Sequence, residues 1–265
     1  MRKIESLLDA DYKRVNILFW DIETSLMQMS LFSLYTNGYL NYKSILNDWY
    51  MLCASWKRLG DKKVQSVSLL DDPKRFKRDI ADDYHVVKTM HGVLSDADAL
   101  IGHNGDKFDL KKFNARAIFH GFDPLPEIPT IDTLKIAKHK FNFTSNRLDY
   151  LAAYLRVGEK LHTSPDLWLR CLLGQKTAIR DMVKYNKVDV SVLERVYGKL
   201  APFAPAKLNM NLFGGKGCPL CGSGHIQKRG TYITRTYKYQ RYTCNDCGHG
   251  FRSAVSDKNV RAILK

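Results

Sequence analysis

The sequence predicts an α/β domain with a mixed sheet flanked by helices, followed by a small basic module with four cysteines. Apolar runs that suit strands come first along the chain, and strands then alternate with helical segments. This order is typical of a mixed sheet rather than of a doubly wound parallel one. The charge and the cysteine content then change together near residue 205, where a stretch rich in proline and glycine breaks helix and strand alike.

The first part of the chain contains candidates for both strands and helices. The run at 15–20, Val-Asn-Ile-Leu-Phe-Trp, is short and mostly apolar, which suits a buried strand. Gly60 and Asp61 favour a hairpin turn between the next two strands. Strands are expected over 15–20, 49–56, 64–70 and 99–103. Helices are expected over 84–94, 108–119, 148–155 and 177–200.

Charge divides the chain into two parts. Residues 206–265 hold eleven basic and two acidic side chains, a net charge of +9, whereas the first 205 residues hold thirty-one basic and twenty-five acidic ones. Four of the six cysteines lie in the second part. We therefore predict a large domain over 1–205 and a basic module over 206–265.

The overall composition limits the class of protein. The chain has 265 residues, of which 45% are hydrophobic, and a formal net charge of +15. This excludes a disordered chain, because such a length and composition can bury a full core. A strongly basic balance indicates an anionic partner, most simply nucleic acid, while solubility alone is the other explanation.

No segment of the sequence predicts a membrane or secretory protein. No stretch approaches the roughly 18 apolar residues of a membrane span. Residues 1–14 are polar and charged and lack the apolar centre of a secretory signal. We therefore expect a cytoplasmic protein without a membrane partner.

Two acids follow the first predicted strand. Alternate residues of an extended chain share a face, so Asp21 and Glu23 point the same way as Ile17 and Phe19. Two neighbouring carboxylates repel each other unless a cation lies between them or one is neutralised. The alternative is a strand that ends in a polar turn.

Two further acids lie at helical positions. Asp109 follows a strand and a glycine turn and opens a helix, where an acid also has the ordinary role of complementing the helix dipole. Tyr185, Asp189, Val192 and Val196 form one helical stripe, and its valines indicate a face toward the core. A buried Asp189 would need a basic partner or a metal. The alternative is an aspartate that reaches solvent past a narrow stripe.

Taken in order, these motifs resemble the three exonuclease motifs of the DEDD superfamily in its tyrosine branch, DEDDy. The matching segments are Asp21-Ile-Glu23, Asn104-Gly-Asp-Lys-Phe108-Asp109 and Tyr185-Asn-Lys-Val-Asp189. Lys184 stands where the histidine branch has its histidine. The resemblance implies a 3′–5′ exonuclease with a ribonuclease H-like fold. The motifs look most like those of stand-alone exonucleases of tailed phages, which implies the host cytoplasm.

The resemblance also implies roles for the five motif residues. Carboxylates are ligands that Mg²⁺ and Mn²⁺ prefer, and two such ions can promote the hydrolysis of a phosphodiester. By resemblance, Asp21 bridges both ions, Glu23 and Asp189 complete the first site, and Asp109 supports the second. Tyr185 would orient the attacking water by hydrogen bonding.

Three more residues are implied to bind the nucleic acid. By resemblance, Thr24 meets the terminal 3′-hydroxyl, Leu26 wedges against the last base, and Asn104 contacts the single strand. The alternatives are a helix N-cap, a core leucine and a turn asparagine. We interpret His103, which precedes Asn104, as structural, and Asp106 as an acid outside the motif.

The four cysteines of the basic module form two Cys-x-x-Cys pairs. Twenty-two residues separate the pairs Cys218/Cys221 and Cys244/Cys247. In a cytoplasmic chain this spacing predicts one structural Zn²⁺ held by all four thiolates, and redox disulfides are the alternative. Because the module is small and polar, it has little hydrophobic core, and we expect the metal to supply folding energy. Cys53 and Cys171 stand apart, and we expect them to be small core residues.

A segment between the cysteine pairs alternates arginine and tyrosine. As a strand, it would place four side chains on one face, namely Arg235, Tyr237, Tyr239 and Arg241. Arginine can meet phosphates while tyrosine stacks on bases. The alternative is that the tyrosines form the small core of the module. The module resembles the zinc ribbons at the start of some insertion-sequence transposases, which bind DNA, although a ribbon can instead bind protein.

Together these features predict a metal-dependent 3′–5′ exonuclease that acts on DNA, on single strands or 3′ ends, with a zinc ribbon that assists DNA binding. A ribonuclease acting on RNA, or a structure-specific endonuclease on the same core, is one alternative. A non-catalytic protein for DNA binding or recruitment is the other. The sequence does not identify protein partners.

Overall fold

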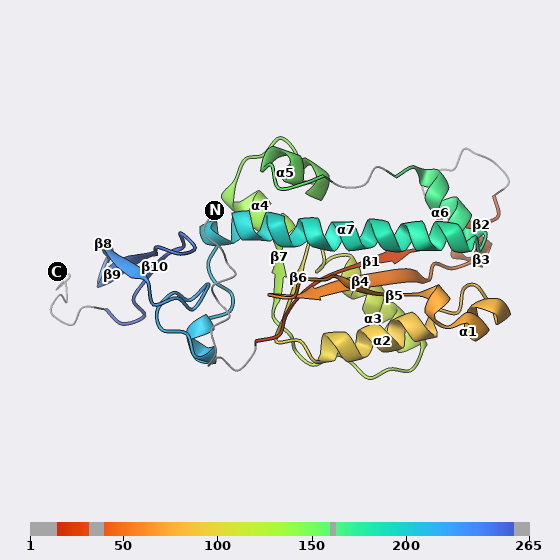
Figure 1. The fold of residues 1–265 in the computed structure, drawn as a ribbon, viewed down its shortest axis with the longest axis horizontal. Helices are drawn as coiled ribbons and strands as arrows, with labels where there is room; N and C mark the ends of the chain where they lie inside the picture. Colours follow the sequence, from red (N-terminus) through yellow and green to blue (C-terminus); the bar gives the residue numbers. More distant parts are fainter. Residues whose placement is uncertain (1–14, 32–39, 160–162, 257–265) are drawn as a thin grey trace.

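The computed structural model describes residues 15–31, 40–159 and 163–256 of the chain (Figure 1). The segment 1–14, in which we saw no secretory signal, lies outside these residues. Within the described ranges, no helix combines the length and the apolar character that crossing a membrane requires.

A five-stranded mixed sheet forms the centre of the large domain, with the strand order β5-β4-β1-β6-β7. Strand β1 pairs antiparallel with β4 and parallel with β6. The strands are β1 (Ile17–Thr24), β4 (Met51–Arg58), β5 (Gln65–Ser68), β6 (Ala99–Gly102) and β7 (Thr130–Asp132). A separate pair is formed by β2 (Gln28–Met29) and β3 (Ile45–Asn47). The predicted mixed sheet is thus confirmed.

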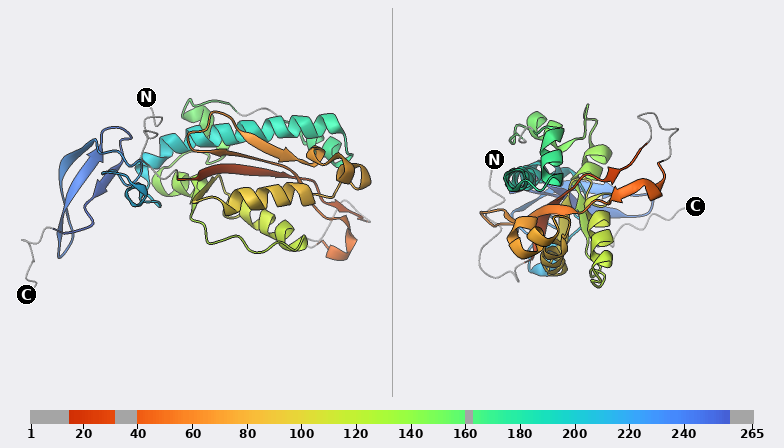
Figure 2. Two further views of the ribbon diagram at one scale, coloured as in Figure 1. Left: turned by 60° about the horizontal axis from the view of Figure 1, so that its bottom comes forward. Right: turned by 90° about the vertical axis from the view of Figure 1, so that its right-hand side faces the viewer.

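Helices cover both faces of this sheet (Figures 1 and 2). One face carries α2 (Tyr84–Ser95) and α3 (Asp109–Phe119). The other face carries α4 (Thr133–Lys140), α5 (Leu148–Tyr154) and the long α7 (Lys176–Leu200). The shorter helices α1 (Pro73–Arg78) and α6 (Pro165–Leu172) lie near the end of the sheet where α7 begins.

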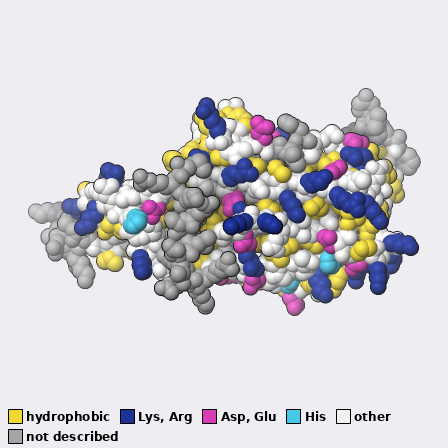
Figure 3. Space-filling model, viewed as in Figure 1, with side chains coloured by type: hydrophobic (Ala, Val, Ile, Leu, Met, Phe, Trp, Pro, Cys, Tyr) yellow, Lys and Arg dark blue, Asp and Glu magenta, His cyan; other side chains and the backbone are white. Residues whose placement is uncertain are grey.

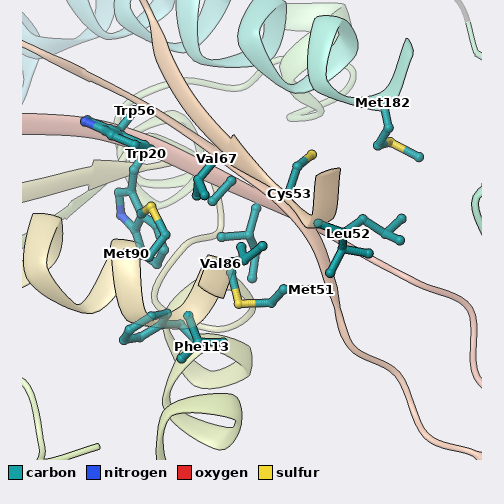
Figure 4. Packing of buried hydrophobic residues seen from close by; sticks show 14 of the residues in the cluster. Trp20, Met51, Leu52, Cys53, Trp56, Val67, Val86, Met90, Phe113 and Met182 are labelled. Carbon is teal, nitrogen blue, oxygen red and sulfur yellow. The ribbon is translucent and has the colours of Figure 1, made fainter. Parts of the chain in front are cut away.

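The central strands are apolar on both sides because each face of the sheet is covered. On the α2 and α3 side, Trp20 of β1 packs with Met90 and Phe113 of these helices (Figure 4). On the α7 side, Phe19 packs with Leu193. Buried side chains on both faces of the sheet therefore fix β1 in the middle of the domain.

Each of the eight predicted elements is found, with ends shifted by a few residues. The hairpin turn between β4 and β5 is also found, and Gly60 adopts a positive φ of 89° there, a conformation that favours glycine. The sequence did not indicate the short elements β7, α1, α4 and α6. Their apolar patterns are too brief to be told from loops.

The basic module forms a three-stranded antiparallel sheet at the end of α7 (Figure 1). Its strands are β8 (Ile226–Ile233), β9 (Lys238–Cys244) and β10 (Gly250–Arg252). His249 joins the module to the end of α7, since its Nδ1 lies 3.0 Å from the carbonyl oxygen of Pro202. The placement of the domain boundary at residue 205 stays a prediction.

One part of the strand prediction in this module was wrong. Arg235 and Tyr237 lie in the connection between β8 and β9, and β9 begins only at Lys238. The chain reverses there because Tyr237 N–H donates to the hydroxyl of Thr234 at 2.9 Å while Thr234 N–H donates to the carbonyl of Tyr237 at 2.8 Å. Of the four predicted residues, Tyr239 and Arg241 lie on a strand.

Candidate active site

Three of the predicted carboxylates converge. Asp21 and Glu23 of β1 and Asp189 of α7 each offer an oxygen, and these oxygens lie within 4.8 Å of one another. Asp21 and Glu23 continue the face of β1 on which Ile17 and Phe19 pack against α7, because side chains alternate along a strand. The local sequence of β1 therefore aims both acids at the helix.

Helix α7 supplies the third acid from its buried stripe. Val192 and Val196 are fully buried against the sheet, and Asp189, one turn earlier, is only 5% exposed. The structure thus shows the buried aspartate and not the solvent-exposed alternative. Tyr185 lies a further turn earlier and is half-buried, with its ring edge-on to Trp168 at 5.9 Å between centroids.

Asn186 is a polar residue of this site that sequence reasoning missed. Its Nδ2 donates a hydrogen bond to Oδ2 of Asp21 at 2.6 Å, and Asn186 is fully buried. The available signal was its position, three residues before Asp189 on the same face of a helix. Its contact with a strand 165 residues away depends on the tertiary fold.

Asp109 lies beside this group rather than within it. It opens α3 as predicted, and its Oδ1 accepts the backbone N–H of Ile22, the residue between the two acids of β1, at 3.3 Å. Burial raises the pKa of Asp109 to about 7, and the charge of Asp132 adds to this effect. A nearby cation would stabilise the ionised form of such a carboxylate.

Asp132 positions the loop before Asp109. It caps α4 by accepting the N–H of Leu134, and it also accepts the N–H of Asn104, both at 2.9 Å. Asn104 has a positive φ of 66°, a backbone conformation that asparagine adopts more readily than most residues and that is typical of a turn. His103 lies between Thr133 and the carbonyl of Asn146, at 2.9 and 3.0 Å, consistent with a structural role.

Thr24 and Leu26 follow the two acids at the end of β1. A bulge separates Glu23 from Thr24. Leu26 is 43% exposed, so it is not a core leucine. The ammonium of Lys112 lies 3.5 Å from the Thr24 hydroxyl and 3.8 Å from the centre of the Trp49 ring. Sequence reasoning missed this lysine and tryptophan, because their pairing joins two distant segments.

The four cysteines of the basic module lie together as the spacing predicted. Their Sγ atoms lie within 4.8 Å of one another, and the Cys218–Cys247 and Cys221–Cys244 pairs are each 3.6 Å apart. This separation far exceeds a disulfide bond of about 2.05 Å. It resembles the edge, about 3.8 Å, of a tetrahedron with Zn–S bonds of about 2.3 Å. The group could therefore hold zinc, and the disulfide alternative is not what the structure shows.

Asp106, Arg235 and Tyr237 do not join the acidic group. Asp106 forms an ion pair with Lys135 at 2.5 Å. Residues 235–241 belong to the basic module, which lies beyond the C-terminal end of α7 (Figure 1). The predicted acidic and arginine–tyrosine sites are therefore two separate places in the molecule.

Comparison with known proteins agrees with this fold. The chain is similar over 85% of its length to the family B DNA polymerase from the hyperthermophilic archaeon Pyrobaculum calidifontis, with 15% sequence identity and a TM-score of 0.50. It spans 32% of that polymerase chain. No curated protein matches the sequence. The model of the RNase_H superfamily matches residues 18–201. Since this match covers more than half of the chain, the protein belongs to the ribonuclease H superfamily.

Proposed function

We propose that this protein is a metal-dependent 3′–5′ exonuclease of the DEDDy type that acts on DNA. The observation that carries the proposal is the convergence of Asp21, Glu23 and Asp189 at the junction of β1 and α7. Membership of the ribonuclease H superfamily supports nuclease chemistry. The similarity to a DNA polymerase supports DNA as the nucleic acid.

The residues at this site fit a pair of Mg²⁺ or Mn²⁺ ions. Three carboxylates with oxygens within 4.8 Å would repel one another strongly without a cation, and hard oxygen ligands are those that these ions prefer. Asp21, Glu23 and Asp189 would hold one ion, and Asp21 with Asp109 the second. When bound, the ions would supply charge stabilisation for the attacking and leaving oxygens of the phosphodiester.

The remaining residues of the site would position the substrate and the water. Tyr185 lies one turn from Asp189 and would orient the attacking water through its hydroxyl group. Thr24 and Leu26, at the end of β1, would meet the terminal nucleotide, and Leu26 is exposed enough to contact a base. Asn104 would contact the strand that follows.

The basic module would hold the DNA while the large domain cleaves it. Its four cysteines would bind one Zn²⁺, which would stabilise the fold of the module, and the large domain would carry the catalytic site. The eleven basic side chains of this segment favour a polyanionic partner. On the face shown in Figure 3, Lys and Arg side chains lie both along α7 and on the module.

Labelled oligonucleotides test the proposed activity. DNA single strands labelled at the 5′ end should shorten stepwise with Mg²⁺ or Mn²⁺, because nucleotides leave from the 3′ end. Asp21→Asn should reduce the rate by about 10³-fold, since several kcal/mol of charge stabilisation are lost. Asp106→Asn is the matched control and should keep the wild-type rate, because Asp106 pairs with Lys135 outside the acidic group.

Other products would contradict the proposal. Internal cuts would indicate an endonuclease, and preferential digestion of an RNA copy would indicate a ribonuclease. Absence of cleavage by pure, metal-loaded protein that still binds DNA would indicate a recruitment protein.

A further inference from the structure

The sheet of the basic module has two chemically different faces. The inner face carries Ile226, Cys244 and Phe251, which pack together around the cysteine group. Tyr242 lies on this face as well, and its ring stacks on Phe251 with centroids 5.5 Å apart. The module thus builds its small core from one face, and neither Tyr237 nor Tyr239 contributes to it.

The outer face carries an arginine–tyrosine cluster, which we define as Tyr232, Tyr237, Tyr239 and Arg252. Tyr232 of β8 lies directly opposite Tyr239 of β9. The guanidinium carbon of Arg252 lies 4.7 Å from the ring centre of Tyr232 and 4.1 Å from that of Tyr239. The Tyr237 ring lies 6.3 Å from that of Tyr239. The cluster is therefore a continuous aromatic and cationic surface.

This cluster remains open to solvent. Tyr232 and Tyr237 are each 46% exposed, and Arg252 is exposed as well. Arg241 lies opposite Arg252 in the pairing of β9 with β10 and adds a second guanidinium at the edge of the cluster. Among residues 206–256, eight side chains are basic, and Asp246 is the single acidic one. An acidic or aromatic ligand fits such a surface better than a neutral apolar one.

We propose that the arginine–tyrosine cluster is a stacking site for the bases of a single-stranded nucleic acid. Tyrosine rings offer faces on which unpaired bases stack, and arginines contact the phosphates between them. Duplex DNA fits the cluster poorly, because its bases already stack on each other. Tyr232 and Arg252 are the two members of the site that the sequence motifs did not indicate.

The position of the cluster links it to the proposed nuclease. Asp189 lies eleven residues before Leu200, the last residue of α7, which corresponds to roughly 17 Å along the helix. At about 3.4 Å per stacked nucleotide, about five stacked nucleotides span this length of helix. If the acidic group cleaves the 3′ end as proposed above, the cluster would hold the part of the strand upstream of that end. This step of the inference rests on the proposed function.

Binding by the full-length, zinc-loaded chain tests the stacking site. The probes are fluorescent single strands of about 20 nucleotides, oligo-dT and oligo-U, and a duplex of equal length, all in an Asp21→Asn background that leaves them uncleaved. Tyr239→Ala and Arg252→Ala should each weaken single-strand binding by about tenfold, whereas Tyr239→Phe should bind as the parent does. The duplex should be affected less than the single strands. The tighter of the two single strands identifies the ligand.

Two controls keep the test decisive. Arg229→Ala removes the same charge from an exposed position of β8 outside the cluster, and Tyr154→Ala removes a tyrosine that is 61% exposed on the large domain. Equal losses for Arg229→Ala and Arg252→Ala would overturn the stacking site in favour of general charge attraction. Tyr232→Ala serves as a second variant, because an exposed ring can be removed without loss of the core. Unchanged affinity in Tyr232→Ala and Tyr239→Ala would also overturn it.

Cleavage assays separate this inference from the proposed function. With an intact acidic group, the cluster variants should digest an oligonucleotide of about four nucleotides at the parental rate and a 20-nucleotide strand more slowly at limiting concentration. If nothing is cleaved but the binding losses follow the pattern above, the nuclease proposal fails and the stacking site stands. If cleavage occurs with no change in binding, the stacking site fails alone.

Discussion

Asn186 donates a hydrogen bond from its Nδ2 to Oδ2 of Asp21 at 2.6 Å and so joins helix α7 to strand β1 inside the acidic group. Both residues come from elements that are fixed by the two core clusters, so the contact holds the Asp21 carboxylate in one orientation. Hydrogen bonds to charged groups are worth about 1.5–3 kcal/mol. Because Asn186 is fully buried, water could not easily replace its amide donor if the side chain were removed.

Replacement of Asn186 should therefore impair metal use more than folding. We expect Asn186→Ala to lower the cleavage rate by about 10-fold to 100-fold and to raise the Mg²⁺ concentration that gives half-maximal activity. The stabilisation by Mn²⁺ in thermal denaturation should decrease in parallel, which is a readout independent of cleavage. Asn114→Ala, at an exposed position of α3, is the control. An unchanged metal dependence would show that Asn186 is only a packing residue.

Arg116 should be essential for the stability of the large domain. Asp83 is fully buried and accepts two hydrogen bonds from Arg116, at 2.7 and 2.6 Å, and the N–H of Met51 at 2.8 Å. Nε2 of His120 also lies 2.6 Å from Asp83, but the guanidinium of Arg116 is the permanently charged partner. Removing one partner of a buried ion pair leaves an uncompensated charge and costs about 3–5 kcal/mol. Urea denaturation of Arg116→Ala should show a loss of this size.

An ion pair with an exposed arginine provides the comparison, and its aspartate keeps Arg75 as a second partner at 2.9 Å. Arg78 pairs with Asp82 at 2.5 Å, but the Arg78 side chain is 68% exposed. Its replacement by alanine should cost less than about 1 kcal/mol. Equal losses for Arg78→Ala and Arg116→Ala would contradict the structural role of the buried pair.

Local patterns predicted the parts of this protein whose cause is local. The apolar run of β1 and the valine stripe of α7 each follow from periodicity, so the approach of Asp21 and Glu23 to Asp189 could be expected from the sequence and the family resemblance. The Cys-x-x-Cys spacing likewise predicted that the four cysteines would lie together, as they do. Where an apolar pattern runs through a whole helix or strand, it determines which face of that element is buried.

Features that depend on tertiary contacts could not be predicted. The Asn186–Asp21 bond and the approach of Lys112 to Trp49 join segments that are distant in the sequence. In the basic module, the alternation around Tyr239 suggested one continuous strand. The side chain of Thr234 instead closes a turn with Tyr237, and this turn decides where β9 begins.

Zinc removal should unfold the basic module and leave the large domain folded. The buried group of the module is centred on Cys218, Cys221 and Cys244, whereas the large domain has two larger apolar clusters, one of which also includes Met210. Metal binding supplies much of the folding energy of such small modules. After chelation and return of Mg²⁺, cleavage of an oligonucleotide of about four nucleotides should persist, while binding of long single strands should weaken. Circular dichroism should show loss of strand signal with the helical signal retained, and loss of the helical signal would contradict two independent units.

Cys53 and Cys171 should resist thiol reagents in the folded protein, because both are buried in the core. Burial raises the pKa of Cys53 well above its usual value, and burial with the nearby acids Glu23 and Asp181 raises that of Cys171 to about 11, against the opposing effect of Arg170. The thiolate is the reactive form, so at a pH of about 8 roughly one Cys171 in a thousand is ionised even where a reagent can reach it.

Alkylation followed by peptide mass spectrometry should label four cysteines after zinc removal and all six only after denaturation. The rate for Cys171 should rise about tenfold per pH unit below its pKa. Labelling of Cys53 or Cys171 in the native protein at a rate like that of the freed module cysteines would contradict the closed core around β4 and α6.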